Sequence, residues 1–158
     1  MRTLIIYDSL YGNTEKLAQI IGNTIGQQGE VEIVKVGDVK LETLGGIDLL
    51  VVGSPTQQFK PTAAMSSFLN NIPKKGLKGI KVAVFDTRLT QAEIDKTPPL
   101  SFFERIFGYA AQRLVKALKV KGGELILPGE GFFVKGMKGP LAEGEEERAE
   151  HWARQLFA

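Results

Sequence analysis

A short stretch near the start of the chain carries side chains that could bind an anion such as a phosphate. The stretch consists of Ser9, Leu10, Tyr11, Gly12, Asn13 and Thr14. It lies between a continuously apolar run at residues 4–7 and a segment of helical period, so a helix N-terminus should direct backbone N–H groups at a ligand. Hydroxyl and amide side chains add donors, and Gly12 lets a ligand approach the backbone closely. An ordinary capped turn has the same composition and is the alternative at this point.

The spacing within this stretch excludes the two common nucleotide-binding loops. It lacks the GxxxxGK[ST] pattern of P-loop proteins, and it lacks the GxGxxG pattern of dinucleotide-binding domains. No lysine or arginine falls within the six residues. The expected phosphate donors are therefore backbone N–H groups, hydroxyls and an amide.

The composition excludes several other kinds of catalytic and metal site. The chain has no cysteine and a single histidine, His151, which rules out disulfides, thiol nucleophiles, iron–sulfur clusters and cysteine-based zinc sites. His151 lies between Glu150 and Trp152, and we expect it on an exposed helix position. We therefore predict no catalytic residue and no metal site, and any redox chemistry would need a bound cofactor.

Short β-branched runs alternate with longer segments of helical period, a pattern typical of an α/β fold. Strands are expected at residues 4–7, 31–36, 47–53, 81–85 and 125–127, and the last can resume at 132–134. Helices are expected at residues 13–25, 65–72, 103–118 and 143–157. Right-handed crossovers give a three-layer, doubly wound sandwich around a five-stranded parallel sheet. Ligands of such sheets bind outside the carboxyl ends of the strands, which directs attention to the loops after the first, third and fourth strands.

The first of these loops resembles the phosphate loop of the flavodoxin-like family, in which [ST]-x-T-G-N-T follows the first strand. Tyr11 stands at the position of the middle threonine. The resemblance covers nearly the whole chain and implies the strand order 2-1-3-4-5. It also implies that the loop binds the 5′-phosphate of flavin mononucleotide (FMN). The implied phosphate ligands are Ser9, Gly12, Asn13, Thr14 and the backbone N–H of Tyr11.

The loop after the third strand resembles the second flavin loop of flavodoxin domains in multidomain flavoproteins and quinone reductases, which reads G-[ST]-P-T. The resemblance makes Ser54, Pro55, Thr56 and Gln57 neighbours of the flavin ring or the ribityl chain. Phe59 either stacks on the ring or covers the core. The segment at residues 130–141 resembles the C-terminal part of small stand-alone flavodoxin-domain proteins, and it marks the family rather than a site.

The third loop departs from the family pattern, which is rich in glycine and acidic residues and often includes a tyrosine that stacks on the ring. Residues 85–91 contain neither glycine nor tyrosine, and Asp86, Thr87 and Arg88 are the residues expected near the flavin. Arg88 either lies at the pyrimidine edge, where its charge would raise the second reduction potential, or forms a surface ion pair with Asp86 or Glu93. Both interpretations leave Arg88 exposed. The polar stretch at residues 91–99 is a candidate lid.

These features predict an FMN-binding electron carrier that exchanges electrons with redox partner proteins. The alternative is an FMN-dependent reductase of a quinone or a similar small acceptor, and a non-redox flavin-sensing or partner-binding module is also left open. The chain has 20 basic and 18 acidic side chains, a net charge of +2. Because common flavodoxins are strongly acidic, this charge indicates a different partner surface and a less negative flavin potential.

The length, the hydropathy and the charge pattern set the remaining expectations. A chain of 158 residues has the size of one domain, which we assign to residues 1–158. No apolar run approaches 18 residues, so we expect a cytoplasmic protein with no membrane segment. The lysines form no basic face interleaved with aromatic residues, so nucleic acid is not an expected partner. The sequence sets no oligomeric state.

Overall fold

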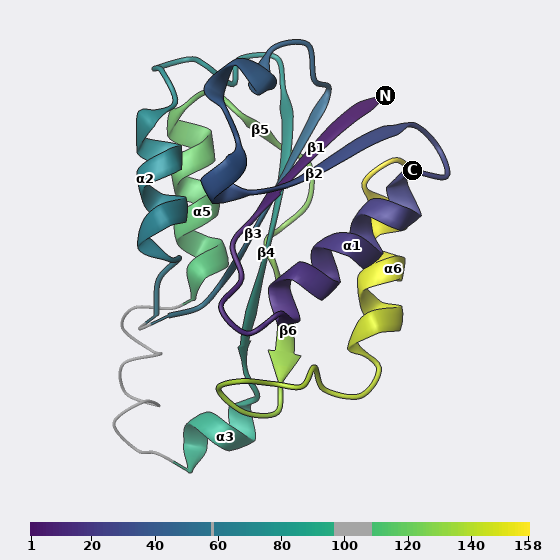
Figure 1. Ribbon diagram of the computed structural model, residues 1–158, viewed down its shortest axis with the longest axis vertical. Helices are drawn as coiled ribbons and strands as arrows, with labels where there is room; N and C mark the ends of the chain where they lie inside the picture. Colours follow the sequence, from purple (N-terminus) through teal and green to yellow (C-terminus); the bar gives the residue numbers. More distant parts are fainter. Residues whose placement is uncertain (58, 97–108) are drawn as a thin grey trace.

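The computed structural model describes residues 1–57, 59–96 and 109–158. Its strands are β1 (Arg2–Tyr7), β2 (Glu30–Lys35), β3 (Leu49–Pro55), β4 (Lys81–Leu89), β5 (Glu124–Leu125) and β6 (Glu130–Val134). They form one parallel sheet in the order β2-β1-β3-β4-β5, and β6 also pairs with β4 (Figure 1). The predicted strand order 2-1-3-4-5 is therefore confirmed.

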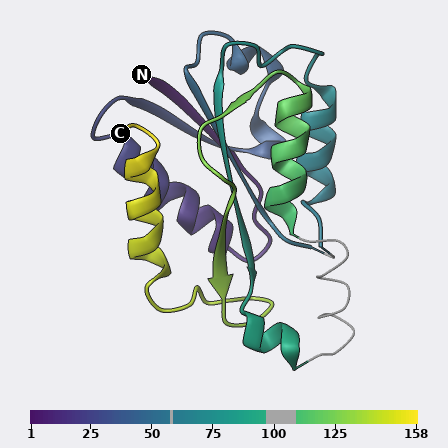
Figure 2. The same cartoon turned by 180° about the vertical axis from the view of Figure 1, so that it is seen from behind.

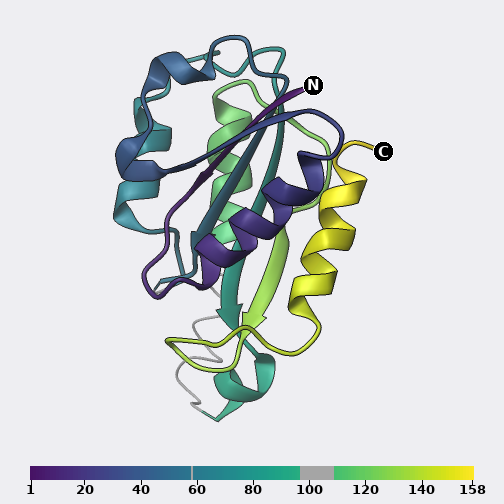
Figure 3. The same cartoon turned by 45° about the vertical axis from the view of Figure 1, so that its right-hand side comes forward.

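Helices cover both faces of the sheet, which confirms the three-layer architecture. The helices are α1 (Asn13–Ile25), α2 (Ala63–Asn71), α3 (Gln91–Asp95), α5 (Ala110–Val120) and α6 (Glu145–Gln155), with 3₁₀ turns η1 (Val36–Asp38) and η2 (Leu41–Leu44). Figure 3 shows α1 and α6 side by side on one face, and Figure 2 shows α2 and α5 on the other. The short helix α3 lies beyond the carboxyl end of β4 (Figure 1).

Alternate side chains of the central strands fill two separate apolar cores. In β1, Leu4 and Ile6 belong to the core beneath α2 and α5, whereas Ile5 belongs to the core beneath α1 and α6. Strand β3 divides in the same way, with Leu50 in the first core and Val51 in the second. Successive side chains of a strand point to opposite faces, and both faces are covered here. This explains why the strands are continuously apolar in sequence.

The fifth strand is divided in two. Strand β5 pairs with the start of β4, with Lys81 opposite Glu124, and β6 pairs with its end, from Phe85 opposite Glu130 to Leu89 opposite Val134. The expected strand at residues 125–127 therefore ends at Leu125, and the expected continuation at 132–134 is found within β6. Gly129 lies between them, in a close approach where a Cβ would be 3.0 Å from Val84 Cγ2.

Strand β4 is longer than expected, and this changes the setting of the third loop. It continues to Leu89 because β3 and β6 both extend alongside it, with Ser54 opposite Asp86 and Arg88 opposite Phe133. The expectation of a loop from residue 86 onward is wrong for residues 86–89. Of the candidate lid at residues 91–99, residues 91–95 form α3 and residues 97–99 lie outside the described residues. Residues 103–108 of the expected helix at 103–118 also lie outside them.

An aromatic cluster and an ion-pair network attach α6 to the sheet. The rings of Phe85, Phe132 and Trp152 meet edge to face, with centroids 6.1–6.2 Å apart. Glu145 at the start of α6 accepts a 2.7 Å hydrogen bond from the backbone N–H of Phe133 and two hydrogen bonds from Arg148. The Arg148 guanidinium also donates to Glu130 and to the carbonyl of Gly131, and it lies over the Phe132 ring. His151 lies on the exposed side of α6, as expected.

Glu145 should make the stability of the fold depend on pH. Burial by itself raises the pKa of Glu145, but the hydrogen bonds from Arg148 and Phe133 outweigh it and hold that pKa below its usual value. The unfolded state then binds more protons, so the contribution of Glu145 is complete above a pH of about 4.3 and is lost as the pH falls through the lowered pKa. Glu145→Gln is expected to cost about 1 kcal/mol at pH 7 and to flatten the acid limb of the stability curve.

Urea denaturation at a series of pH values from neutral to acidic measures this effect. The matched control is Glu146→Gln, because Glu146 is the next residue of α6 and pairs with Lys16 at the exposed surface. Surface pairs contribute little, so this variant should keep the acid limb of the wild type. An acid limb that is equally steep in the wild type and in Glu145→Gln would contradict the assignment.

Candidate functional site

A cavity of about 470 Å³ lies at the carboxyl end of the sheet, where the loops after β1, β3 and β4 meet. The predicted site residues that line it are Ser9, Leu10, Tyr11, Asn13, Thr14, Pro55, Thr56, Gln57, Phe59, Thr87 and Arg88. The other three, Gly12, Ser54 and Asp86, are not among its lining residues. The structure thus brings three separate sequence segments together around one space.

The loop between β1 and α1 lines one end of this cavity. Gly12 adopts φ 93°, a left-handed conformation that favours glycine, and it directly precedes the helix. The Ser9 hydroxyl oxygen accepts hydrogen bonds from the N–H groups of Gly12 (3.1 Å) and Glu15 (3.3 Å). Within the described residues, the N–H groups of Tyr11 and Asn13 have no protein acceptor. These groups, at the positive end of α1, suit an anionic ligand.

Thr14 and Asn13 connect this loop to distant parts of the chain. The Thr14 side chain is buried, and its Oγ1 lies 3.0 Å from Thr87 Oγ1 at the end of β4. Asn13 Nδ2 donates a 3.2 Å hydrogen bond to the carbonyl oxygen of Lys138, in the loop after β6. The β1–α1 loop is thereby fixed against two other walls of the cavity.

The end of β3 combines a buried polar network with an exposed turn. The hydroxyl of Ser54 is fully buried and accepts a hydrogen bond from the N–H of Thr62, whose own hydroxyl donates to Asp8 at 2.5 Å. Ser54 therefore supports the wall of the cavity from behind. Gln57 and Lys60 exchange backbone hydrogen bonds in a tight turn. This turn holds Phe59, at φ 66°, against the cavity.

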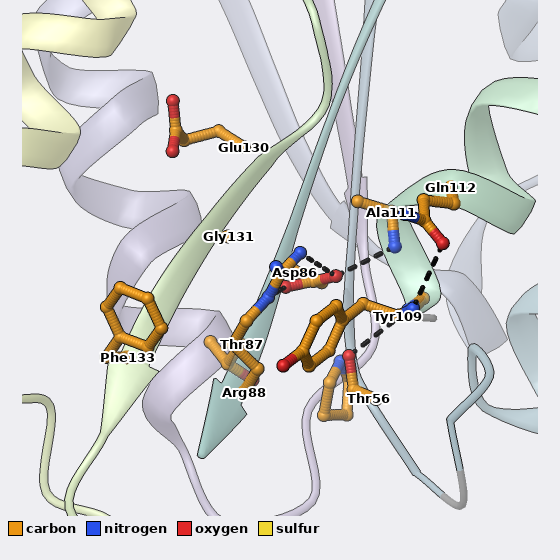
Figure 4. A network of polar contacts seen from close by, with 12 residues as sticks. Thr56, Asp86, Thr87, Arg88, Tyr109, Ala111, Gln112, Glu130, Gly131 and Phe133 are labelled. Carbon is orange, nitrogen blue, oxygen red and sulfur yellow. Dashed lines mark hydrogen bonds and ion pairs between the residues drawn. The ribbon is translucent and has the colours of Figure 1, made fainter. Parts of the chain in front are cut away.

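A second polar network joins the ends of β3 and β4 to the start of α5 (Figure 4). Arg88 forms a two-pronged ion pair with Asp86, with N–O distances of 2.7 and 2.8 Å. The same Asp86 carboxylate accepts a 2.8 Å hydrogen bond from the N–H of Ala111, and Thr56 Oγ1 accepts one from the N–H of Ala110. The first N–H groups of α5 are therefore satisfied by side chains from the two strands.

Arg88 is more buried than the sequence indicated. Its side chain is 17% exposed and that of Asp86 is fully buried, so the predicted ion pair with Asp86 is present but the predicted exposure is wrong. The Arg88 guanidinium carbon lies 3.7 Å from the centroid of the Tyr109 ring. On the other side it lies against Gly131, where a Cβ would be 2.2 Å away. Asp86 balances the charge of Arg88, so Arg88 offers no free positive charge to the flavin. The predicted rise in the second reduction potential depends on such a charge.

Comparison with known proteins places this site within a family. The sequence profile described as flavodoxin matches residues 5–152, which is nearly the whole chain. The chain belongs to the flavodoxin family. Flavodoxin family proteins bind FMN as their cofactor.

Individual flavodoxins resemble the chain over different lengths. The flavodoxin of Clostridium beijerinckii is 33% identical over 84 residues, which is 51% of this chain and 60% of that protein. The flavodoxin of Maridesulfovibrio salexigens is 32% identical over 89 residues, 53% of this chain and 61% of that protein. The matches thus span about 60% of these relatives. The structure of oxidised flavodoxin 1 from Bacillus cereus superposes with a TM-score of 0.78 and 19% sequence identity. The superposition covers 99% of this chain and 97% of that chain, which shows that the two share a fold.

Five residues of the flavodoxin cavity were not predicted from the sequence. They are Leu89, Ile94, Tyr109, Val134 and Met137. The sequence gives no signal for Leu89 and Ile94, because residues 86–99 have the composition of a polar connection, and none for Tyr109, which lies far along the chain from the third loop. Val134 and Met137 fall in the segment at residues 130–141, which was read as a family marker. The side-by-side pairing of β6 with the end of β4 brings that segment to the cavity.

Across residues 1–57, 59–96 and 109–158, no histidine, aspartate and glutamate side chains gather in a group that could hold a metal ion. In the same residues, no helix is long and apolar enough to cross a membrane.

Proposed function

We propose that this chain binds FMN in the cavity at the carboxyl end of the sheet and carries electrons between partner proteins. The strongest support is that the two ends of this cavity differ in chemical character. The β1–α1 end has N–H groups without a protein acceptor among the described residues, together with hydroxyls. Aromatic and aliphatic side chains make up most of the remaining walls, which also include Thr56, Gln57, Thr87 and Arg88. FMN has a phosphate at one end and a flat aromatic ring at the other. A volume of about 470 Å³ also falls in the usual range for cofactor pockets, about 300–1,000 Å³.

The lining residues can be assigned to the parts of FMN by their chemistry. Ser9, Asn13 and Thr14 would hold the phosphate together with the N–H of Tyr11, and Gly12 gives the loop the required conformation. Leu10 lies beside them in the cavity wall. Pro55, Thr56, Gln57 and Thr87 would border the ribityl chain and the ring. Phe59 and Tyr109 would supply aromatic walls, and Asp86 would act through Arg88 and α5 rather than by contact.

An electron carrier needs no acid or base in its protein part, because bound FMN supplies the redox chemistry and the protein supplies orientation and electrostatics. The described lining residues include no histidine and no carboxylate, which favours the carrier. The alternative function is an FMN-dependent reductase of a quinone or a similar small acceptor.

The visible absorption spectrum of the purified protein, mixed with excess FMN and then desalted, tests the proposal. Loss of all flavin would contradict it, and rapid NAD(P)H oxidation in the presence of a quinone would favour the reductase.

Thr14→Val should weaken FMN binding through the phosphate end. The hydroxyl that is lost would donate to the phosphate, and a hydrogen bond to a charged group contributes about 1.5–3 kcal/mol, or roughly 10- to 150-fold in Kd. Riboflavin, which lacks the phosphate, should bind both proteins about equally. Fluorescence titration of each flavin measures the two affinities.

The matched control for this test is Thr24→Val, because Thr24 is a second buried threonine of α1 and its hydroxyl donates to Ile20 within the helix. That variant reports any general effect of changing a buried threonine in α1. An equal FMN affinity for Thr14→Val and Thr24→Val would remove the phosphate assignment.

We also propose that residues 1–158 form one domain and that its partners are redox proteins rather than nucleic acid. The family match over residues 5–152 supports the single domain. The net charge of +2 supports a partner surface unlike that of the acidic flavodoxins.

A further inference from the structure

The phosphate loop has an unfavourable balance of charged side chains. It contains no lysine or arginine, Asp8 directly precedes it and Glu15 follows it in the first turn of α1. Lys16 is close by, but its ammonium contacts Glu146 of α6. A dianionic phosphate at this loop would therefore have two acidic neighbours in sequence and no basic residue within the loop, and the nearest lysine in sequence already has an acidic partner.

A lysine from a distant part of the chain lies against this loop. Lys138 is in the loop that follows β6, which runs along the same end of the sheet as the start of α1 (Figure 1). Its carbonyl oxygen accepts the hydrogen bond from Asn13, and its ammonium lies over the Tyr11 ring, 5.9 Å from the centroid. Among the described residues, Lys138 forms no ion pair. The backbone carbonyl and the ammonium of Lys138 thus both lie against the phosphate loop, and among the described residues no carboxylate pairs with the ammonium.

The position of Lys138 is set by the backbone around it. Lys135 N–H donates to the Pro140 carbonyl and Gly139 N–H donates to the Gly136 carbonyl, both at 2.9 Å, which closes the loop on itself. Gly139 adopts φ 94°, and a Cβ there would lie 2.5 Å from Asn13 Oδ1. Only a residue without a side chain permits this approach, so the loop is held directly against Asn13.

We propose that Lys138 is a phosphate-recognition residue that neutralises part of the charge of the FMN 5′-phosphate. The inference rests on the proposed FMN site and adds a cationic group to a loop that has none of its own. A lysine is a compact charge on a flexible stem, and it can swing from the Tyr11 ring toward a phosphate at the loop without moving the backbone. The residue thereby selects FMN over riboflavin, which has the same ring and no phosphate.

The test compares the affinities of FMN and riboflavin in Lys138→Gln and in a matched control. Lys138→Gln should raise the Kd of FMN by roughly three- to tenfold, in keeping with a partly exposed charge pair, and leave the Kd of riboflavin unchanged. The increase should shrink with added salt, because the Debye length falls from about 30 Å at 0.01 M to about 8 Å at 0.15 M. Lys138→Arg should keep the FMN affinity. The control is Lys135→Gln, which removes the same charge from the same loop, where Lys135 faces Glu143.

Each result separates this inference from the proposed function. If the wild type binds FMN and Lys138→Gln binds it equally well, the role of Lys138 is overturned and the FMN site stands. An equal loss of FMN and riboflavin affinity would also overturn it, because the residue would then act on the ring or on the loop conformation. The same holds if Lys135→Gln weakens FMN as much as Lys138→Gln does. Failure of the wild type to bind either flavin would overturn the proposed function and this inference together.

Discussion

Arg88→Met is expected to lower the free energy of unfolding by about 3 kcal/mol, because it leaves the fully buried carboxylate of Asp86 without its partner. Methionine matches roughly the stem of arginine and lacks the guanidinium, so the change removes mainly the charge and the two hydrogen bonds. Among the described residues, the N–H of Ala111 would be the one remaining hydrogen-bond donor to Asp86. The loss of the contact with the Tyr109 ring adds to the effect.

Urea denaturation of the wild type and the variant measures this loss. The control is Lys96→Met, which breaks an ion pair with Glu93 in which the lysine side chain is 71% exposed. Such a surface pair contributes about 0–1 kcal/mol, so the control should remain close to the wild type. Adding Asp86→Asn to Arg88→Met removes the stranded charge and should recover part of the stability. Equal stability of Arg88→Met and Lys96→Met would show that the pair does not hold the end of β4 in place.

The strand positions could be predicted because local patterns carry them, and the strand order followed from the resemblance to the flavodoxin-like family. The central strands are apolar on both faces, and the phosphate loop follows the first of them as a contiguous motif. The end of β4 could not be predicted in the same way. Asp86, Thr87 and Arg88 are polar and read as a loop, but β3 and β6 extend beside them and supply backbone partners. Polar side chains are buried there because they pair with a neighbour, as Asp86 does with Arg88, or with a distant residue, as Thr87 does with Thr14.

The same reasoning explains which parts of the candidate site were missed. Thr14 was predicted from its motif, but its contact with Thr87 joins residues 73 positions apart. Tyr109 reaches the cavity only through the packing of α5 on β4, and Lys138 reaches the phosphate loop only through the loop after β6. Neither residue has a local sequence signal. The net charge of +2 was read as a property of the whole surface, whereas the structure gives one of its lysines a specific place at the phosphate loop.

Gly53→Ala is expected to be strongly destabilising, by about 3 kcal/mol, through overpacking of a rigid core. Gly53 lies in β3, and a Cβ on it would be 2.1 Å from Cζ of Phe85. The Phe85 ring is fully buried and is fixed edge to face between Phe132 and Trp152, so it has no space into which it can move. The control is Gly37→Ala, because a Cβ on Gly37 meets nothing within 4 Å and that variant should keep its stability.

A double-mutant cycle with Phe85→Leu tests whether this clash is the cause. Phe85→Leu alone should cost about 1.5 kcal/mol for the lost apolar surface and the space it leaves. If the Cβ and the ring compete for one volume, the double variant should lose about 1–2 kcal/mol less than the sum of the single losses, whereas strictly additive losses would rule this out.

The clash should also disturb the cofactor site, because the Gly53 carbonyl accepts a 3.0 Å hydrogen bond from the N–H of Asp8, where the phosphate loop begins. Gly53→Ala should therefore weaken FMN binding along with the fold, and Phe85→Leu, which leaves that hydrogen bond in place, should weaken mainly the fold.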